Sequence, residues 1–278
     1  MTKVRDFVVP PSLQAHAEAW LDGGERMTEA APKLAASVML LREKQHRPTV
    51  FMLRRVPSMA FAASMWVFPG GGTDPRDAEV DVPWAGPSPV EWSRAMGLPQ
   101  DVAQAVVIAA VREVFEECGV LLAGPSSDSV VGDVTGEGWR ADRAALVDHT
   151  LAFAELLRRR RLVLRSDLLA LQDHWITPRM EPKRYDTWFF VARLPDGQQA
   201  DDDTTEADLS EWVDPAALLR DAADGKARVL PPTIVQLENL AAAVSFASAL
   251  VGRPGVIPVM PEPHRTADGI VLRTILAD

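Results

Sequence analysis

Three carboxylates fall within five residues in the stretch Arg112-Glu113-Val114-Phe115-Glu116-Glu117-Cys118-Gly119-Val120. Apolar side chains recur there at spacings of four, three and four, which predicts an amphipathic helix with one buried stripe, made of Val107, Val111, Val114 and Cys118. Glu113 and Glu117 then lie together on another face, where they repel each other unless a cation is bound nearby. Gly119 stands where a helix commonly ends in a left-handed residue. Because an acidic run is also typical of a solvated helix face, both interpretations stay open at this point.

A glycine turn precedes this helix in the sequence. The stretch Val67-Phe68-Pro69-Gly70-Gly71-Gly72-Thr73-Asp74 predicts a strand that ends in three glycines. Because glycine has no Cβ, backbone at such a turn can approach a phosphate group closely or adopt a positive φ.

Together the two stretches resemble the Nudix box, in which Gly, five residues, Glu and seven residues precede Arg-Glu, an aliphatic residue, any residue, Glu-Glu, any residue, Gly and an aliphatic residue. The second half matches at each fixed position from Arg112 to Val120. The first half matches as Gly71 followed, after five residues, by Asp77, which replaces the family's Glu. Thirty-four residues separate Asp77 from Arg112, so the box carries an insertion of about twenty-seven, roughly 78–104. Its Pro, Gly and Trp content favours an ordered excursion.

A split box of this kind is similar to that of the coenzyme A diphosphatase branch, which is related to the mammalian peroxisomal acyl-CoA diphosphatases. Three further regions resemble that branch: Val50 to Arg55 with Met65 to Gly71, His174 to Pro178 with Arg184 to Phe190, and Leu230 to Thr233. The resemblance therefore spans about residues 35 to 240.

The fold that the resemblance implies is an α/β class Nudix-fold α/β/α sandwich with a mixed sheet, an insertion in the box and a C-terminal helical extension. We expect an N-terminal extension at 1–34, a Nudix hydrolase domain at 35–230, and a C-terminal helix and tail at 231–278. The residue patterns predict strands at 35–41, 49–54 and 188–194, and one amphipathic helix at 142–160. A long apolar helix is expected at 231–251, where it could also contact a second copy in a homodimer.

Composition limits the classes of function. The 278 residues carry a net charge of −10, which argues against a nucleic-acid partner, because binding a phosphate backbone requires clustered Lys and Arg. The single cysteine, Cys118, lies on the apolar stripe and is expected to be a small buried hydrophobe. No run of eighteen apolar residues and no signal peptide is evident, so the sequence predicts a cytoplasmic protein without a membrane span.

The chemistry that the resemblance implies is metal-dependent hydrolysis of a phosphoanhydride. Glu113, Glu116 and Glu117 are the expected ligands of Mg²⁺ or Mn²⁺, since both cations prefer oxygen donors. Glu116 is also a candidate base, Arg112 is expected to hold the glutamates, and the Gly70, Gly71 and Gly72 turn to shape the site. The expected substrate is coenzyme A or an acyl-CoA, cleaved to 3′,5′-ADP and a 4′-phosphopantetheine product.

The general base and the substrate contacts are expected outside the box. Glu206, in the acidic loop 201–208, is the first candidate for the base, with Glu181 and Asp186 as alternatives; the same loop could simply be solvated. Four basic residues are candidates to bind substrate phosphates: Arg54, Arg55, Lys183 and Arg184. Five side chains could line an apolar channel for an acyl or pantetheine arm, or belong to the core: Met52, Met59, Met65, Trp66 and Tyr185.

Two alternatives remain at this stage. One keeps the chemistry and changes the substrate to NADH, ADP-ribose or a nucleotide sugar. The other is a Nudix-fold ligand-binding protein that has lost catalysis, which Asp77 and the insertion leave possible and the three intact box glutamates oppose.

Overall fold

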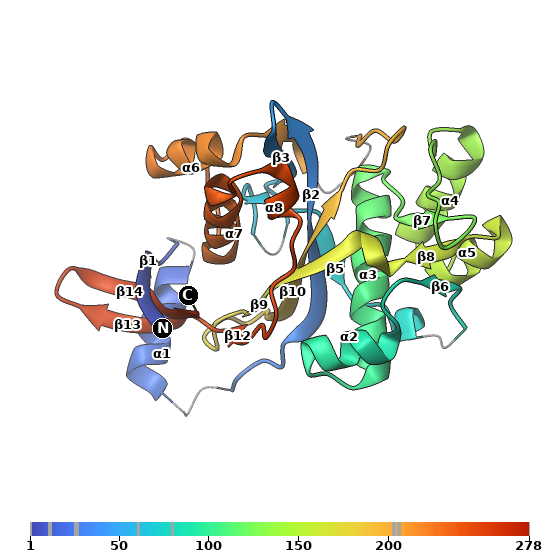
Figure 1. The fold of residues 1–278 in the computed structure, drawn as a ribbon. Helices are drawn as coiled ribbons and strands as arrows, with labels where there is room; N and C mark the ends of the chain where they lie inside the picture. The colour runs from blue at the N-terminus through green and yellow to red at the C-terminus, as the bar shows by residue number, and fades with distance from the viewer. Residues whose placement is uncertain are drawn as a thin grey trace.

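The structure is a computed structural model that describes residues 2–10, 13–24, 28–59, 62–78, 81–201, 204 and 207–277. A central mixed sheet lies between two layers of helices (Figure 1). One layer holds α2 (Pro89–Met96), α3 (Gln100–Cys118), α4 (Glu137–Val147) and α5 (Phe153–Arg160). The other holds α6 (Pro215–Ala223), α7 (Pro231–Ala242) and α8 (Phe246–Ala249). The predicted α/β/α sandwich is confirmed, and no helix among the described residues is long and apolar enough to cross a bilayer.

The central sheet has the strand order β11-β3-β2-β10-β9-β12. Its members are β2 (Lys33–Lys44), β3 (Arg47–Arg55), β9 (Leu169–Ile176), β10 (Tyr185–Arg193), β11 (Ala207–Val213) and β12 (Pro258–Val259). Strand β10 pairs in parallel with β2 and antiparallel with β9, so the sheet is mixed as expected. Side chains on its two faces enter two separate buried cores, because successive residues of a strand point to opposite faces.

Strands β2 and β3 pair with each other only at one end, and this separation creates room for the glycine turn. Their register runs from Leu41↔Val50 to Lys44↔Arg47. Beyond it, β3 pairs with β4 (Trp66–Val67), and β2 pairs with β5 (Gly70–Gly72). The three glycines therefore lie inside the sheet, at the place that α3 covers.

The insertion in the box is ordered where the structure describes it, as expected. It contains β6 (Trp84–Ala85) and α2, whose first turn carries a reciprocal capping box between Ser88 and Glu91. Trp92 of α2 contacts Phe190 of β10 edge to face, with ring centroids 5.7 Å apart. Strand β6 joins β7 (Ala123–Gly124) and β8 (Val163–Arg165) in a small sheet beside α5.

Two predicted helices differ from the observed ones. The helix expected at 142–160 is divided into α4 and α5, because the chain turns at His149, whose φ is 55°. The helix expected at 231–251 ends at Ala242 and resumes only as the short α8. The expected tail contains β12 and a hairpin of β13 (Glu262–Thr266) and β14 (Gly269–Ala277).

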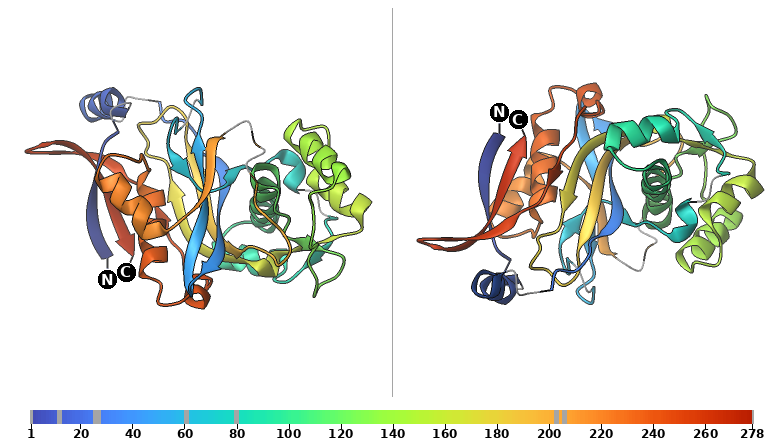
Figure 2. Two further views of the ribbon diagram at one scale, coloured as in Figure 1. Left: turned by 90° about the horizontal axis from the view of Figure 1, so that it is seen from above. Right: turned by 90° about the horizontal axis from the view of Figure 1, so that it is seen from below.

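The two ends of the chain form one sheet. Strand β1 (Thr2–Val8) pairs antiparallel with β14, from Thr2↔Ala277 to Val8↔Val271. This terminal sheet and α1 (Gln14–Gly23) lie on the side of the central sheet that carries α7, opposite α3 (Figure 2). The division of the chain at residues 34 and 230 stays a prediction. The pairing of β1 with β14 nevertheless brings the expected N-terminal extension, 1–34, into contact with the expected C-terminal segment, 231–278.

Candidate active site

The last turns of α3 carry the carboxylates, as the sequence predicts. Its stripe of Val107, Val111, Val114 and Cys118 is fully buried, and burial raises the pKa of the Cys118 thiol. Gly119 ends the helix with φ of 66°, and its N–H donates to the carbonyls of Val114 and Phe115. The helix is buried well beyond that stripe, since Arg112 and Glu117 are each only 6% exposed.

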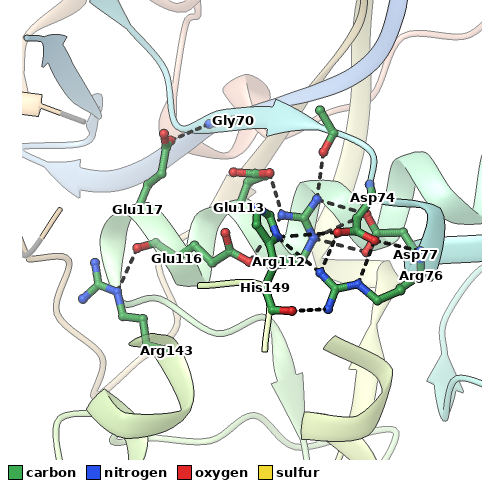
Figure 3. Close-up of polar contacts among 11 residues, drawn as sticks. Gly70, Asp74, Arg76, Asp77, Arg112, Glu113, Glu116, Glu117, Arg143 and His149 are labelled. Carbon is green, nitrogen blue, oxygen red and sulfur yellow. Dashed lines mark hydrogen bonds and ion pairs between the residues drawn. The ribbon is translucent and has the colours of Figure 1, made fainter. Parts of the chain in front are cut away.

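The guanidinium of Arg112 lies at the centre of a buried charge network (Figure 3). One nitrogen donates to Glu113 Oε1 at 2.6 Å and is 3.3 Å from Glu116 Oε1. Another donates to the Gly72 carbonyl at 2.8 Å and to Asp77 Oδ2 at 3.0 Å. One cation therefore faces three carboxylates, which leaves the buried network with excess negative charge.

Asp77 occupies the first acidic position of the box and is bound to the same guanidinium. It lies in the short helical turn η3 (Pro75–Ala78), is 2% exposed, and accepts from Arg112 Nε at 3.1 Å. Its second oxygen also accepts the Asp74 N–H at 2.8 Å. The shorter acid in place of the family's Glu therefore still reaches Arg112, because η3 brings its backbone close to α3.

Strand β5 lies directly against the glutamates. The Gly70 N–H donates to Glu117 Oε2 at 2.7 Å. A Cβ built on Gly71 would lie 2.5 Å from the Glu113 carboxylate, whereas one on Gly72 would be 3.7 Å from its nearest neighbour, the Leu34 carbonyl. The absence of a side chain at residue 71 therefore makes the space that Glu113 occupies.

We expect Gly71→Ala to lower kcat/KM at least tenfold, because the new methyl group must displace the Glu113 carboxylate from its position. Gly72→Ala is the matched control, since its methyl group meets only ordinary contact distances. Steady-state kinetics and thermal melts of both variants check this. Equal kinetics for the two variants would contradict the role given to Gly71.

Burial also changes the acidity of the glutamates. It raises the pKa of Glu113 to about 7, against the opposing effect of Arg112. Burial raises the pKa of Glu116 as well. Because burying a charge is costly unless it is paired, an additional positive charge at this point would stabilise both ionised forms.

A cavity of about 750 Å³ adjoins the glutamates. Its lining includes Glu113, Glu116 and Glu117 at one part and apolar side chains at another, among them Met59, Trp175, Phe189, Leu230 and Leu272. Of the side chains considered for an apolar channel, Met59 and Tyr185 line the cavity, whereas Met52, Met65 and Trp66 are buried in the core.

Helix α4 contributes residues to the cavity that the sequence did not indicate. Arg143 is 7% exposed and donates to the Glu116 carbonyl at 2.9 Å and to Asp201 at 2.7 Å. Its remaining nitrogen has no hydrogen-bond partner among the described residues. His149 lies near Asp74, which accepts a forked pair of bonds from Arg76 that holds the pKa of Asp74 well below its usual range. No local signal marks Arg143, because an arginine on an amphipathic helix usually faces solvent.

The basic residues predicted to contact phosphates separate into two pairs. Arg55 and Lys183 line the cavity. Arg54 does not, and it forms a forked ion pair with Asp208 at 2.8 and 3.1 Å. Arg184 is 3% exposed and outside the lining, where it donates to Glu29 and to the carbonyls of Ala30 and Thr177.

The candidate bases also differ in position. Glu206 lies outside the described residues, so its role stays a prediction. Asp186 is bound to the buried ring of His174 and does not line the cavity. Glu181 does line it, and burial raises its pKa to about 7, with Arg184 opposing the shift.

This raised pKa gives Glu181 a predictable effect on stability. Between pH 4.5 and about 7 the unfolded chain releases this proton while the folded chain keeps it, so the free energy of unfolding falls as pH rises. We expect Glu181→Gln to be more stable than wild type at pH 8, by at most roughly 3 kcal/mol, and equal to it near pH 4. Urea unfolding from pH 4 to 8 measures the difference. A difference that is constant with pH would refute it, and Glu155→Gln, at an exposed position of α5, serves as control.

Comparison with known proteins shows which family the chain belongs to. A model of the NUDT19 Nudix domain matches residues 88–240, more than half of the chain. The chain belongs to this Nudix family. As a Nudix hydrolase it is an enzyme that cleaves phosphoanhydride bonds.

Named relatives of this Nudix hydrolase include two acyl-coenzyme A diphosphatases called NUDT19. The human protein is 28% identical over 271 residues, which cover 80% of this chain and 69% of the relative. The Xenopus laevis protein is 26% identical, over 69% of this chain and 59% of the relative. A crystal structure of a Nudix hydrolase from Alicyclobacillus acidocaldarius shares the fold, with a TM-score of 0.69 and 24% identity over 81% of this chain and 99% of the other.

The residues of the Nudix hydrolase fit a divalent cation in their chemistry. No three acidic, histidine or cysteine side chains converge on one point among the described residues. Glu113 and Glu116 instead face Arg112, and Glu117 accepts from Gly70. The donors are nevertheless hard carboxylate oxygens that line a cavity, and such oxygens are the ligands that Mg²⁺ and Mn²⁺ prefer.

Proposed function

We propose that this Nudix hydrolase uses Mg²⁺ or Mn²⁺ to hydrolyse the diphosphate of coenzyme A or an acyl-CoA, with 3′,5′-ADP and (acyl-)4′-phosphopantetheine as products. Glu113, Glu116 and Glu117 are the proposed metal ligands. The observation that carries the proposal is that the buried glutamates line a cavity that basic side chains and many apolar side chains also line. That shape suits a substrate with a diphosphate and a long uncharged arm. The names of the two NUDT19 relatives support the same class of substrate.

The chain's own residues have separable tasks in this reaction. Arg112 fixes Glu113 and Glu116, and Asp77 fixes Arg112, so these two are positioning residues. Arg55 and Lys183, which line the cavity, are proposed to bind substrate phosphates, and Arg143 can offer its remaining N–H to an anion. The cation, when bound, neutralises charge on the phosphate oxygens and makes a bound water more acidic.

Hydrolysis also needs a group that accepts a proton. The oxygen of water forms a new bond to phosphorus, the bridging P–O bond breaks, and the second phosphate leaves as an anion. The proton of that water passes to a carboxylate. Glu206 is the proposed acceptor, and Glu181 is the second candidate because it lines the cavity with a pKa of about 7, which suits proton transfer near neutrality.

A substrate panel tests the proposal. Product release is measured from coenzyme A, acetyl-CoA, dephospho-CoA, NADH, ADP-ribose and UDP-glucose, each with Mg²⁺, with Mn²⁺ and with a chelator. We expect metal-dependent cleavage that favours the CoA compounds. Faster cleavage of NADH or ADP-ribose would retain the Nudix chemistry and reject the CoA assignment. Light scattering of the same preparation tests the proposed homodimer.

A further inference from the structure

The terminal sheet is fixed against the body of the enzyme. Phe7, Val9 and Leu272 are buried in the same core as Trp175 and Phe189 of the central sheet. On the same side, Arg5 of β1 pairs with Glu238 of α7, with one nitrogen 2.9 Å from the carboxylate. Strands β1 and β14 therefore have a defined position relative to the face of the central sheet that they cover.

The buried Arg184 ties both terminal segments to a loop of the cavity. Its guanidinium donates to Glu29 and to the Ala30 carbonyl at 2.8 Å, both of which follow α1. It also lies 3.5 Å from the sulfur of Met260, just before β13, and 3.0 Å from the Thr177 carbonyl after β9. Because Thr177 itself lines the cavity, this one cation holds the terminal segments in register with the site.

The terminal segments form part of the cavity wall. Before β2 and after α8, four described residues line it, and all four are apolar: Pro10, Leu13, Pro261 and Leu272. Two of these, Pro261 and Leu272, are buried from solvent although they face the cavity. The same continuous space is lined elsewhere by the three glutamates of α3, so it joins a charged part to an apolar part.

We propose that the chain segments before β2 and after α8 form the end wall of the substrate cavity and hold the hydrocarbon chain of an acyl-CoA, so that Leu13 and Leu272 set the preferred chain length. The inference rests on the proposed function. Each methylene that enters an apolar site contributes about 0.8 kcal/mol, or about a fourfold gain in kcat/KM at most. The gain stops when the chain reaches the wall. Residues 10, 13, 261 and 272 all lie outside the segment that the family model matches.

The test is the ratio of kcat/KM for an acyl-CoA to kcat/KM for free coenzyme A, measured with acetyl-, hexanoyl-, lauroyl- and palmitoyl-CoA. Leu13→Trp and Leu272→Phe both add volume at the wall. The matched control is Val8→Trp on the outer face of β1, where the side chain is 86% exposed and does not line the cavity. Thermal melts show that each variant is folded.

We expect the wild-type ratio to rise with acyl-chain length to a maximum. Both wall variants should shift that maximum to shorter chains. They should also reduce the ratio at least tenfold for acyl chains longer than the new maximum. Val8→Trp keeps the wild-type profile. If the wall variants are folded and also keep the wild-type profile, the proposal of an end wall is wrong, whereas the proposed function is unaffected. If wild type cleaves ADP-ribose or NADH but no CoA compound, the proposed function itself is wrong.

Discussion

Glu117→Gln is expected to lower the turnover number at least a hundredfold without unfolding the enzyme. The substitution removes a negative charge from the proposed metal site, and a hundredfold loss corresponds to about 2.7 kcal/mol in activation free energy. The side chain keeps its size, and an amide oxygen can still accept the Gly70 N–H that now binds Glu117 at 2.7 Å. The fold therefore has little reason to change.

Turnover is measured at saturating substrate across a titration of Mg²⁺ and of Mn²⁺, beside a thermal melt. Glu155→Gln on α5, an exposed position that does not line the cavity, is the control and should match wild type. A Glu117→Gln variant with near-normal turnover and unchanged metal dependence would remove Glu117 from the proposed ligands.

Arg112→Ala is expected to cost stability as well as activity. Burial alone lowers the pKa of Arg112, but Glu113 and Asp77 outweigh it, so the pKa lies above its usual range and the residue stays charged. Without it, three carboxylates remain in the buried network with no guanidinium. Removing one partner from a buried ion pair typically costs about 3–5 kcal/mol, which for a chain of this size lowers the melting temperature by roughly 10 °C.

The matched control is Arg76→Ala, which pairs with the neighbouring Asp74 and has a side chain 34% exposed. An ion pair that is partly exposed contributes less to stability than a buried one, so this variant should melt closer to wild type than Arg112→Ala does. Thermal melts at pH 7 compare the two. If Arg112→Ala melts as close to wild type as Arg76→Ala does, Arg112 is not the charge that balances the buried acids.

Local pattern was sufficient to predict the parts of the site that lie on one element. The spacing of Val107, Val111, Val114 and Cys118 predicted the buried face of α3, and Gly119 predicted where the helix ends, because both depend on neighbours within two turns. The break at His149 was missed, since neither glycine nor proline occurs there and a non-glycine residue takes the positive φ.

Contacts between segments far apart in the sequence could not be predicted from local sequence patterns. Arg184 stands beside Lys183 in the sequence and appeared equally available to a phosphate, yet Glu29 and Met260 bury it. Its burial depends on segments more than seventy residues away in either direction, and no spacing rule reports such a pair. The pairing of β1 with β14 was missed for the same reason.

That pairing also orders events during synthesis. Strand β1 is made before β14 and stays without this partner until β14 has been translated, since Thr2 pairs with Ala277. Contacts between residues so far apart in the sequence form late, because closing the long loop between them costs conformational entropy before the contact can stabilise the chain. The glutamate network, made from residues 70 to 117, can assemble on the ribosome well before the apolar wall exists. Nascent chains would thus acquire the proposed metal-binding glutamates first and the proposed end wall last.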